Sequence, residues 1–166
     1  MRRLRFLSFL SVLTILSATG AHAQTHWVAT LLGSNESPSV SSGAVGQFDA
    51  TLNDAKNSMT FTLTYTGLVG TMTQANIQLG SSGVNGPIVY WLADGNFPSA
   101  ITGCTDPSPS GGGCAFNVSD FSDLQAGNLY VNLRTSYAPN GEIRGQITSA
   151  VPVKSPTWAK MKAMYR

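Results

Sequence analysis

Histidine is the first residue type to weigh, because catalytic triads and zinc or copper sites depend on imidazole. The chain has two histidines, His22 and His26. His22 lies in a predicted export signal, so His26 is left alone at the start of a predicted strand as an exposed polar residue. One imidazole cannot build a site of several histidines, and no serine sits in a nucleophile elbow. The sequence therefore predicts no enzymatic activity, no cofactor and no bound metal.

Carboxylates offer two further kinds of chemistry. Asp120 and Asp123 share one face of a predicted helix, where two acids could serve a glycosidase. With Asp94 and Asp106 they could instead supply oxygen ligands for calcium. Aspartates at a helix start more often complement backbone donors and the helix dipole, and no loop has the dense Asp and Asn alternation of a calcium site. We expect neither site.

Aromatic side chains raise the alternative of a carbohydrate-binding module, which stays open. Tyr90, Trp91 and Phe97 could present a platform for a sugar ring. Neighbours on a strand point to opposite faces, so at least one of Tyr90 and Trp91 is expected in the core.

The two cysteines, Cys104 and Cys114, are separated by nine residues rich in proline, serine and glycine. An even pair that closes a loop in an exported protein is typical of a disulfide. The spacing is wider than in a redox motif, and no histidine follows at zinc-finger spacing. We predict a disulfide, which would stabilise the fold by roughly 3 kcal/mol.

Residues 1–23 are typical of an export signal, because a basic start and an apolar stretch lead to the exit Ala21-His22-Ala23. A retained anchor is the alternative, although the apolar stretch is short. The predicted product is periplasmic or extracellular, with one domain over 24–150 and a basic tail over 151–166. The tail is interpreted as a frayed terminus, and an amphipathic helix that lies on a membrane or partner is the alternative.

The predicted domain has three basic and eight acidic side chains, a net charge of −5. Such a surface does not bind nucleic acid through phosphate contacts. No apolar run after the signal approaches about 20 residues, so no transmembrane segment is expected in the mature chain.

Apolar and polar residues alternate with a period of two through most of the domain, as they do in half-buried antiparallel strands. Residues 59–66 are the clearest case, because four threonines alternate with large apolar residues. The predicted strands are His26–Leu32, 44–52, 59–66, Met72–Leu79, Pro87–Ala93, Ala115–Val118, 129–134 and 143–147. The predicted core consists of Phe48, Leu52, Phe61, Leu63, Ile77, Ile88, Leu129, Val131, Ile143 and Ile147.

The remaining segments connect these strands. Residues 94–113 form a predicted long insertion, and 119–126 a short helix capped by Ser119 or Asp120 and ended by Gly127. A turn at 139–141 aligns Leu133 with Ile143, which places the charged residues together on the opposite face. In this register Asn132 faces Arg144, and Arg134 faces Glu142. The pattern predicts an all-β antiparallel sandwich or barrel.

The chain resembles the CHRD domain, the repeat module of the developmental antagonist chordin, which also occurs singly in exported bacterial proteins. The resemblance covers nearly all of residues 26–150 and is clearest in Ala126-Gly127-Asn128-Leu129-Tyr130-Val131-Asn132-Leu133 and Pro139-Asn140-Gly141-Glu142-Ile143-Arg144-Gly145-Gln146-Ile147. It implies an immunoglobulin-like or superoxide dismutase-like Greek-key sandwich without established enzymatic activity.

One departure from the family pattern concerns a possible site. The family commonly has histidines where this chain has Asn76, Gln78 and Arg134. If those positions form one site in the family, this chain has replaced imidazoles by amides and a guanidinium, which bind anions or hydrogen-bond but hold copper or zinc poorly. The alternative is three exposed polar residues that do not meet. The predicted binding residues are Asn76, Gln78, Asn132, Arg134, Glu142 and Arg144, with no metal ligand.

We therefore expect an exported, non-enzymatic module that binds a protein or another cell-envelope component through its sheet face and its long loop. The enzymatic alternative, implied by the resemblance, is a superoxide dismutase-like or other metal-dependent activity.

Overall fold

The computed structural model describes residues 25–97, 99–108 and 114–150. The predicted export signal and basic tail lie outside these residues. No helix in the described ranges is long and apolar enough to cross a membrane. The strands are β1 (Thr25–Leu32), β2 (Val45–Leu52), β3 (Met59–Thr66), β4 (Met72–Leu79), β5 (Ile88–Asp94), β6 (Ala100–Cys104), β7 (Leu129–Thr135), β8 (Ile143–Gln146) and β9 (Thr148–Ser149).

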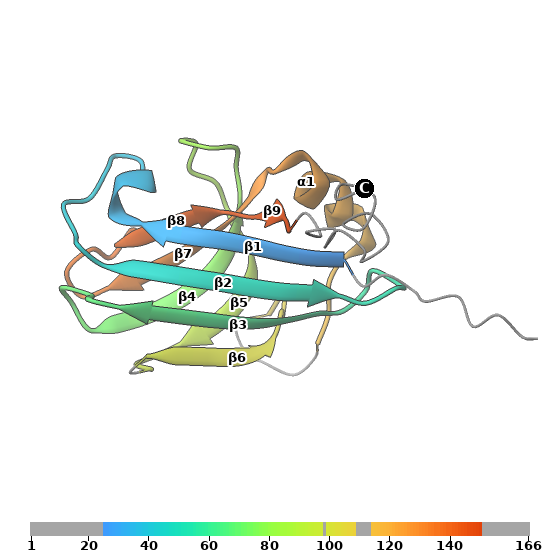
Figure 1. Cartoon of the computed structure of the whole chain (residues 1–166), viewed down its shortest axis with the longest axis horizontal. Helices are drawn as coiled ribbons and strands as arrows, with labels where there is room; N and C mark the ends of the chain where they lie inside the picture. Colours follow the sequence, from blue (N-terminus) through green and yellow to red (C-terminus); the bar gives the residue numbers. More distant parts are fainter. Residues whose placement is uncertain (1–24, 98, 109–113, 151–166) are drawn as a thin grey trace, which may run out of the picture.

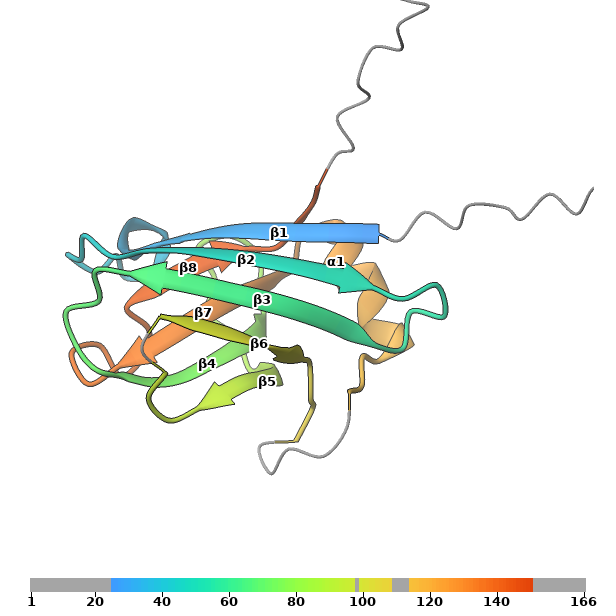
Figure 2. The ribbon, with the colours of Figure 1, turned by 60° about the horizontal axis from the view of Figure 1, so that its bottom comes forward.

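These strands form one antiparallel sheet in the order β5-β4-β7-β8-β1-β2-β3-β6, with β9 beside β1 (Figure 1). The two ends of the sheet approach each other, because Trp91 of β5 and Asp106 after β6 form an isolated bridge. Figure 2 shows β1, β2 and β3 in one layer and β4, β5 and β7 in the other. The prediction of an antiparallel all-β fold is confirmed, while the specific Greek-key sandwich stays a prediction.

The hydrophobic core lies between the two layers. Every second side chain of β2 and β3 is buried, and the threonines of β3 are exposed on the outer surface. Phe48 and Phe61 stack across this strand pair with ring centroids 5.8 Å apart. Nine of the ten predicted core residues are buried. The exception is Ile88, which is half-buried, because the buried residue of β5 is Tyr90.

The segment between β5 and β7 differs most from the prediction. The predicted insertion contains β6, which pairs with β3. Only Ile101 of its five residues is buried, so β6 shows little of the alternation that marks a strand. The strand predicted at Ala115–Val118 is absent. Phe116 instead packs its ring on Tyr90 and donates its N–H to the carbonyl of Asn57 at 2.9 Å.

One short helix follows. The 3-10 turn η2 (Val118–Asp120) leads into α1 (Phe121–Ala126), and Gly127, in the left-handed conformation with φ of 72°, ends the helix as predicted. Asp120, one of the two predicted caps, is the N-cap residue, but its side chain makes no capping hydrogen bond. The Asp120 carboxylate instead accepts a 2.5 Å hydrogen bond from the Tyr90 hydroxyl, which fixes the helix against β5.

The predicted disulfide between Cys104 and Cys114 is present, with Cα atoms 5.0 Å apart. It joins the last residue of β6 to the segment that leads towards η2. Next to it, Thr105 donates from its hydroxyl to the carbonyl of Ala115 at 2.9 Å, and its N–H bonds to the carbonyl of Met59 at 3.0 Å. The disulfide therefore reinforces the point at which the sheet closes on itself.

Candidate functional site

The outward-facing side chains of β4, β7 and β8 form a buried polar layer. We call this set the polar face; its residues are Asn76, Gln78, Tyr130, Asn132, Arg134 and Arg144. All of them are buried except Arg134, which is half-buried. Two loops cover the layer: residues 33–44, which begin with the 3-10 turn η1 (Gly33–Asn35), and residues 80–87. The sheet face, which the protein was expected to use for binding, is therefore covered by loops.

Arg144 attaches the 80–87 loop to the sheet. Its guanidinium stacks on the Tyr130 ring, 3.4 Å from the centroid. The same group donates to the carbonyls of Ser81 at 2.9 Å and Val84 at 3.0 Å. It also donates to the side-chain oxygen of Asn85 at 3.2 Å. With these donors used on its own chain, Arg144 holds a loop rather than facing solvent.

Asn76, Gln78 and Arg134 lie together on this face, on adjacent strands. The Gln78 amide, turned with its oxygen towards Arg134, accepts a 3.1 Å hydrogen bond from Nη2. In that orientation its nitrogen donates to the Tyr130 hydroxyl at 2.5 Å and to the Gly86 carbonyl at 2.9 Å. Asn76 is fully buried, and in the other orientation of the Gln78 amide its side-chain oxygen accepts a 2.7 Å hydrogen bond from the Gln78 nitrogen. The three side chains thus form a polar cluster beneath the loops.

Glu36, in the 33–44 loop, is the acidic residue closest in charge effect to the two arginines. Asn132 donates from its side-chain nitrogen to both carboxylate oxygens, at 3.2 and 3.3 Å. Burial raises the pKa of Glu36 to about 7, although Arg144, Arg134 and the Asn132 hydrogen bond act in the opposite direction. Gly141 leaves the space for this contact, because a Cβ there would lie 2.4 Å from the Asn132 amide nitrogen.

The sequence reasoning missed Glu36. It assigned Glu142 as the acid opposite Arg134 from strand register alone. A usable signal was present: Arg134 and Arg144 are the only arginines of residues 24–150 and fall on one face, so an acid from outside the two strands was needed to balance them.

Glu142 instead joins two loops to the end of β7. Its carboxylate accepts from the hydroxyls of Thr135 at 2.6 Å and Ser42 at 2.7 Å. It also accepts from the backbone N–H groups of Val69 at 2.7 Å and Gly70 at 3.3 Å. Burial alone would raise the pKa of Glu142, but these hydrogen bonds outweigh it and hold the pKa below its ordinary value.

A pocket of about 290 Å³ opens beside Glu36. Its walls come from the 33–44 loop, the 80–87 loop and the turn after β7. Of the side chains that line it, that of Glu36 is the only charged one. The lining residues are Glu36, Ser37, Pro38, Val40, Asn85, Ala138, Pro139, Asn140 and Gly141.

The end of the molecule where β1, β3, β5 and β7 finish presents a surface that we call the loop end. It consists of residues 33–44, 67–71, 95–97 with 99, and 136–141, together with the first residue of β2. Glu36 is its only charged residue, and that side chain is buried. Pockets of about 360 and 450 Å³ lie here. Its exposed large hydrophobic residues are Val45, Val69, Phe97 and Tyr137.

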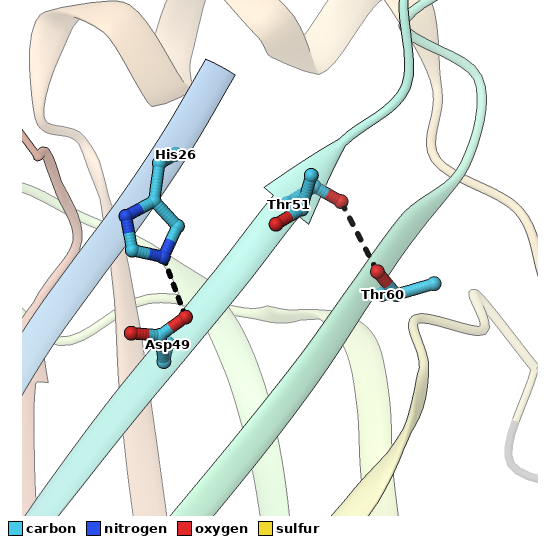
Figure 3. A network of polar contacts seen from close by, with 4 residues as sticks. All are labelled: His26, Asp49, Thr51 and Thr60. Atoms are coloured by element: carbon cyan, nitrogen blue, oxygen red, sulfur yellow. Dashed lines mark hydrogen bonds and ion pairs between the residues drawn. The ribbon is translucent and has the colours of Figure 1, made fainter. Parts of the chain in front are cut away.

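The other candidate residues do not assemble a site. His26 is exposed, as predicted, and its Nε2 lies 2.5 Å from Asp49 on the outer surface of β1 and β2, near the Thr60–Thr51 hydrogen bond (Figure 3). Tyr90 is fully buried, so the proposed aromatic platform is not formed. Within the described ranges, no three His, Cys, Asp or Glu side chains are grouped so that they could hold a metal ion.

Comparison with known proteins gave one match. The family model for the CHRD domain matches residues 27–147, which is most of the chain and confirms the resemblance seen in the sequence. No curated protein and no solved structure gave a match.

Proposed function

We propose that this chain, which belongs to the CHRD domain family, is an exported, non-enzymatic module that binds a protein of the cell envelope or its surroundings. The observation that carries the proposal is the composition of the loop end. Four of the six exposed large hydrophobic side chains in the described residues lie there, on four separate segments without an exposed charge.

This composition is that of an interaction surface. Apolar and aromatic residues are enriched, and charged residues depleted, at the centre of protein interfaces. Loops rich in tyrosine, serine, glycine and asparagine are also the recognition elements of antibodies. Tyr137 is 49% exposed and Val69 is 58% exposed. Their chain neighbours Ala138 and Leu68 line pockets.

The loop end is also held in shape before any partner arrives. Glu142 bonds to two of its segments, through Ser42 and through Val69 and Gly70. It also bonds to Thr135, the last residue of β7, which directly precedes the 136–141 turn. A surface fixed in this way loses less conformational entropy on binding, which favours affinity. By contrast, the polar face is covered by loops and uses its hydrogen bonds internally. We therefore place the binding surface at the loop end and not on the sheet face expected from the sequence.

Export and the lack of catalysis belong to the same proposal. The predicted signal over 1–23 and the disulfide support an oxidising compartment, periplasmic or extracellular. Arg144 and Glu142 use their hydrogen bonds on loops of the same chain, which supports a structural rather than a catalytic role for these two side chains.

Site-specific photo-crosslinking in the producing cell tests the proposal. A photoreactive phenylalanine analogue replaces Tyr137 in one variant and Thr62, on the exposed face of β3, in a matched control. We expect a discrete protein adduct from position 137 that position 62 does not give, and its loss when Val69→Asp is added. No adduct from position 137, or the same adducts from both positions, would overturn the proposal.

A further inference from the structure

Arg134 is the member of the polar face that keeps a route to solvent, because its side chain is half-buried while the other five are buried. A guanidinium group carries five N–H donors. The Gln78 side-chain oxygen takes one of them at 3.1 Å, and Nε is buried without a partner. No residue in the described ranges accepts a hydrogen bond from Nη1. Buried donors are costly when unpaired, so the chain itself satisfies Arg134 incompletely.

Gln74 adds a second donor group to the same face. It lies directly opposite Arg134 in the register of β4 and β7, which brings the Cβ atoms of the two residues to about 5 Å. The side-chain oxygen of Gln74 accepts from Asn76 at 2.8 Å, so its amide nitrogen is left for other contacts. Gln74 is also half-buried. The open side of the polar face therefore presents donors from two strands, which a group that only accepts hydrogen bonds complements.

The charges around Arg134 leave one positive charge without a partner. Arg144 and Arg134 both act on Glu36, whose single carboxylate balances at most one of them. Glu142 does not contribute, because its carboxylate accepts from hydroxyl and backbone groups of other segments. Asp94, at the end of β5, is exposed, and no ion pair joins it to Arg134 in the described part of the chain. A surplus positive charge in a half-buried layer favours a monovalent anion as its partner.

We propose that Arg134 binds the carboxylate group of a ligand at the open side of the polar face, through the N–H groups that Gln78 leaves free. A carboxylate only accepts hydrogen bonds, and its planar shape matches the fork of a guanidinium. Its one negative charge equals the surplus, whereas a phosphate monoester carries nearly two. The carboxylate belongs either to a small free acid or to an acidic side chain of a polypeptide. The site lies on the sheet face, so the inference does not depend on the partner proposed for the loop end.

Titration of the purified chain with sodium acetate at neutral pH tests the inference, with sodium chloride at equal ionic strength as the reference. The Nε–H signal of Arg134 and the amide signals of Asn76 and Gln78 are followed by NMR, and we expect saturable shifts with acetate only. Arg134→Gln should weaken acetate binding about tenfold or more, because the charged donors are lost. Glu36→Gln leaves the donors in place and should strengthen binding severalfold, because it removes a negative charge beside the arginines.

Lys56→Asn is the matched control, because Lys56 is the third basic residue of residues 24–150. Its ammonium group lies over the Phe121 ring of α1, and asparagine tolerates the φ of 56° at this position. The variant removes the same charge as Arg134→Gln and should bind acetate like the parent protein. An equal loss of binding in the two variants would show a general effect of net charge and overturn the inference.

A capped peptide with one glutamate, compared with its glutamine counterpart, separates the two sources of the carboxylate. Tighter binding of the glutamate peptide than of acetate assigns the site to a polypeptide, and weaker binding assigns it to a free acid; both support the inference. No saturable shift with acetate, an equal shift with chloride, or tighter binding of inorganic phosphate would overturn it. The crosslink from position 137 is measured separately, so failure of either experiment leaves the other proposal standing.

Discussion

Two buried glutamates, Glu36 and Glu142, have pKa values that move in opposite directions, because their donors differ. Glu142 receives two hydroxyls and two backbone N–H groups. Glu36 receives one amide, and the two arginines near it do not fully compensate for burial. The fold thus contains one acid that is stabilised in its charged form, Glu142, and another that is stabilised in its neutral form, Glu36.

The first prediction concerns the pH dependence of stability through Glu36. Its pKa is about 7 in the folded chain against an ordinary value of 4.5, so between these values the folded state binds the extra proton. The contribution of Glu36 to the free energy of unfolding is therefore complete below about pH 4.5 and is lost as the pH rises through 7. The loss is on the order of 2–3 kcal/mol. Urea denaturation from pH 4.5 to 8 measures it.

Glu36→Gln removes this titration and is its control variant. The difference in unfolding free energy between the variant and the parent should shift in favour of the variant as the pH rises across this interval. A difference that stays constant with pH would show that folding does not raise the pKa of Glu36.

The second prediction concerns Glu142, for which the sign is reversed. Its folded pKa lies below the ordinary value of 4.5, so its contribution is present above that pH and is lost on acidification. Glu142→Gln places an amide nitrogen against donors and should cost about 1–3 kcal/mol at pH 7. The difference in unfolding free energy between Glu142→Gln and the parent protein should narrow at low pH. Asp94→Asn, at an exposed acid, is the control and should change stability by less than about 0.5 kcal/mol.

At the scale of elements, the sequence predicted those strands whose outer face meets water. On β3 the outward residues are threonines, so burial alternates as the residue types do. On β7 the first five residues are all buried, because the covering loops exclude water from Tyr130 and Asn132 as well. Alternation in residue type still located β7 and its register with β8, with Leu133 opposite Ile143 and Asn132 opposite Arg144. It could not reveal that a second layer of loops lies above.

The third prediction tests the assignment of the two faces of β3. Phe61 is 5% exposed and stacks on Phe48, so Phe61→Ala should cost about 3–5 kcal/mol. Thr62, the next residue, is exposed, and Thr62→Ala should change stability by less than about 0.5 kcal/mol. Chemical denaturation of both variants measures the contrast. A loss below about 1 kcal/mol for Phe61→Ala would contradict the burial of that ring.

Short elements were harder to predict than long ones, for a physical reason. β6 places one residue in the core, and the 114–117 segment is held by the Thr105 and Asn57 backbone rather than by a strand partner. Neither arrangement leaves a periodic pattern. The Tyr90–Asp120 hydrogen bond likewise joins residues 30 positions apart, which residue type alone does not specify.

At the scale of the whole molecule, the candidate site was predicted only in part. Asn76, Gln78 and Arg134 meet, as the family's pattern suggested. Glu36, the acidic residue closest in charge effect to the two arginines, comes from a loop without periodicity, so its position follows from tertiary packing. The loop end likewise assembles four segments that only the sheet order β5-β4-β7-β8-β1-β2-β3-β6 brings together.

The fourth prediction concerns the exported protein as isolated from cells. We expect an N-terminus at Gln24 and an intact mass two hydrogens below that of the reduced chain, since Cys104 and Cys114 are bonded. Thiol labelling of the unfolded, unreduced protein should be negative. Peptides containing Arg2 in the exported species would contradict the predicted cleavage. Two labelled thiols would contradict the disulfide. Reduction should lower stability by about 3 kcal/mol.

The pairing of β9 with β1 determines where the two ends of the described domain lie. Ala150 donates its N–H to the His26 carbonyl at 2.8 Å, so the first and last described residues leave the molecule together, at the end opposite the loop end (Figure 1). A force applied between the two ends of the described domain and the loop end would therefore run parallel to the strands. In that direction the eight register pairs of β1 with β2 are sheared together instead of being unzipped one by one. The β1–β2 pair is thus oriented to resist a force applied along the length of its strands.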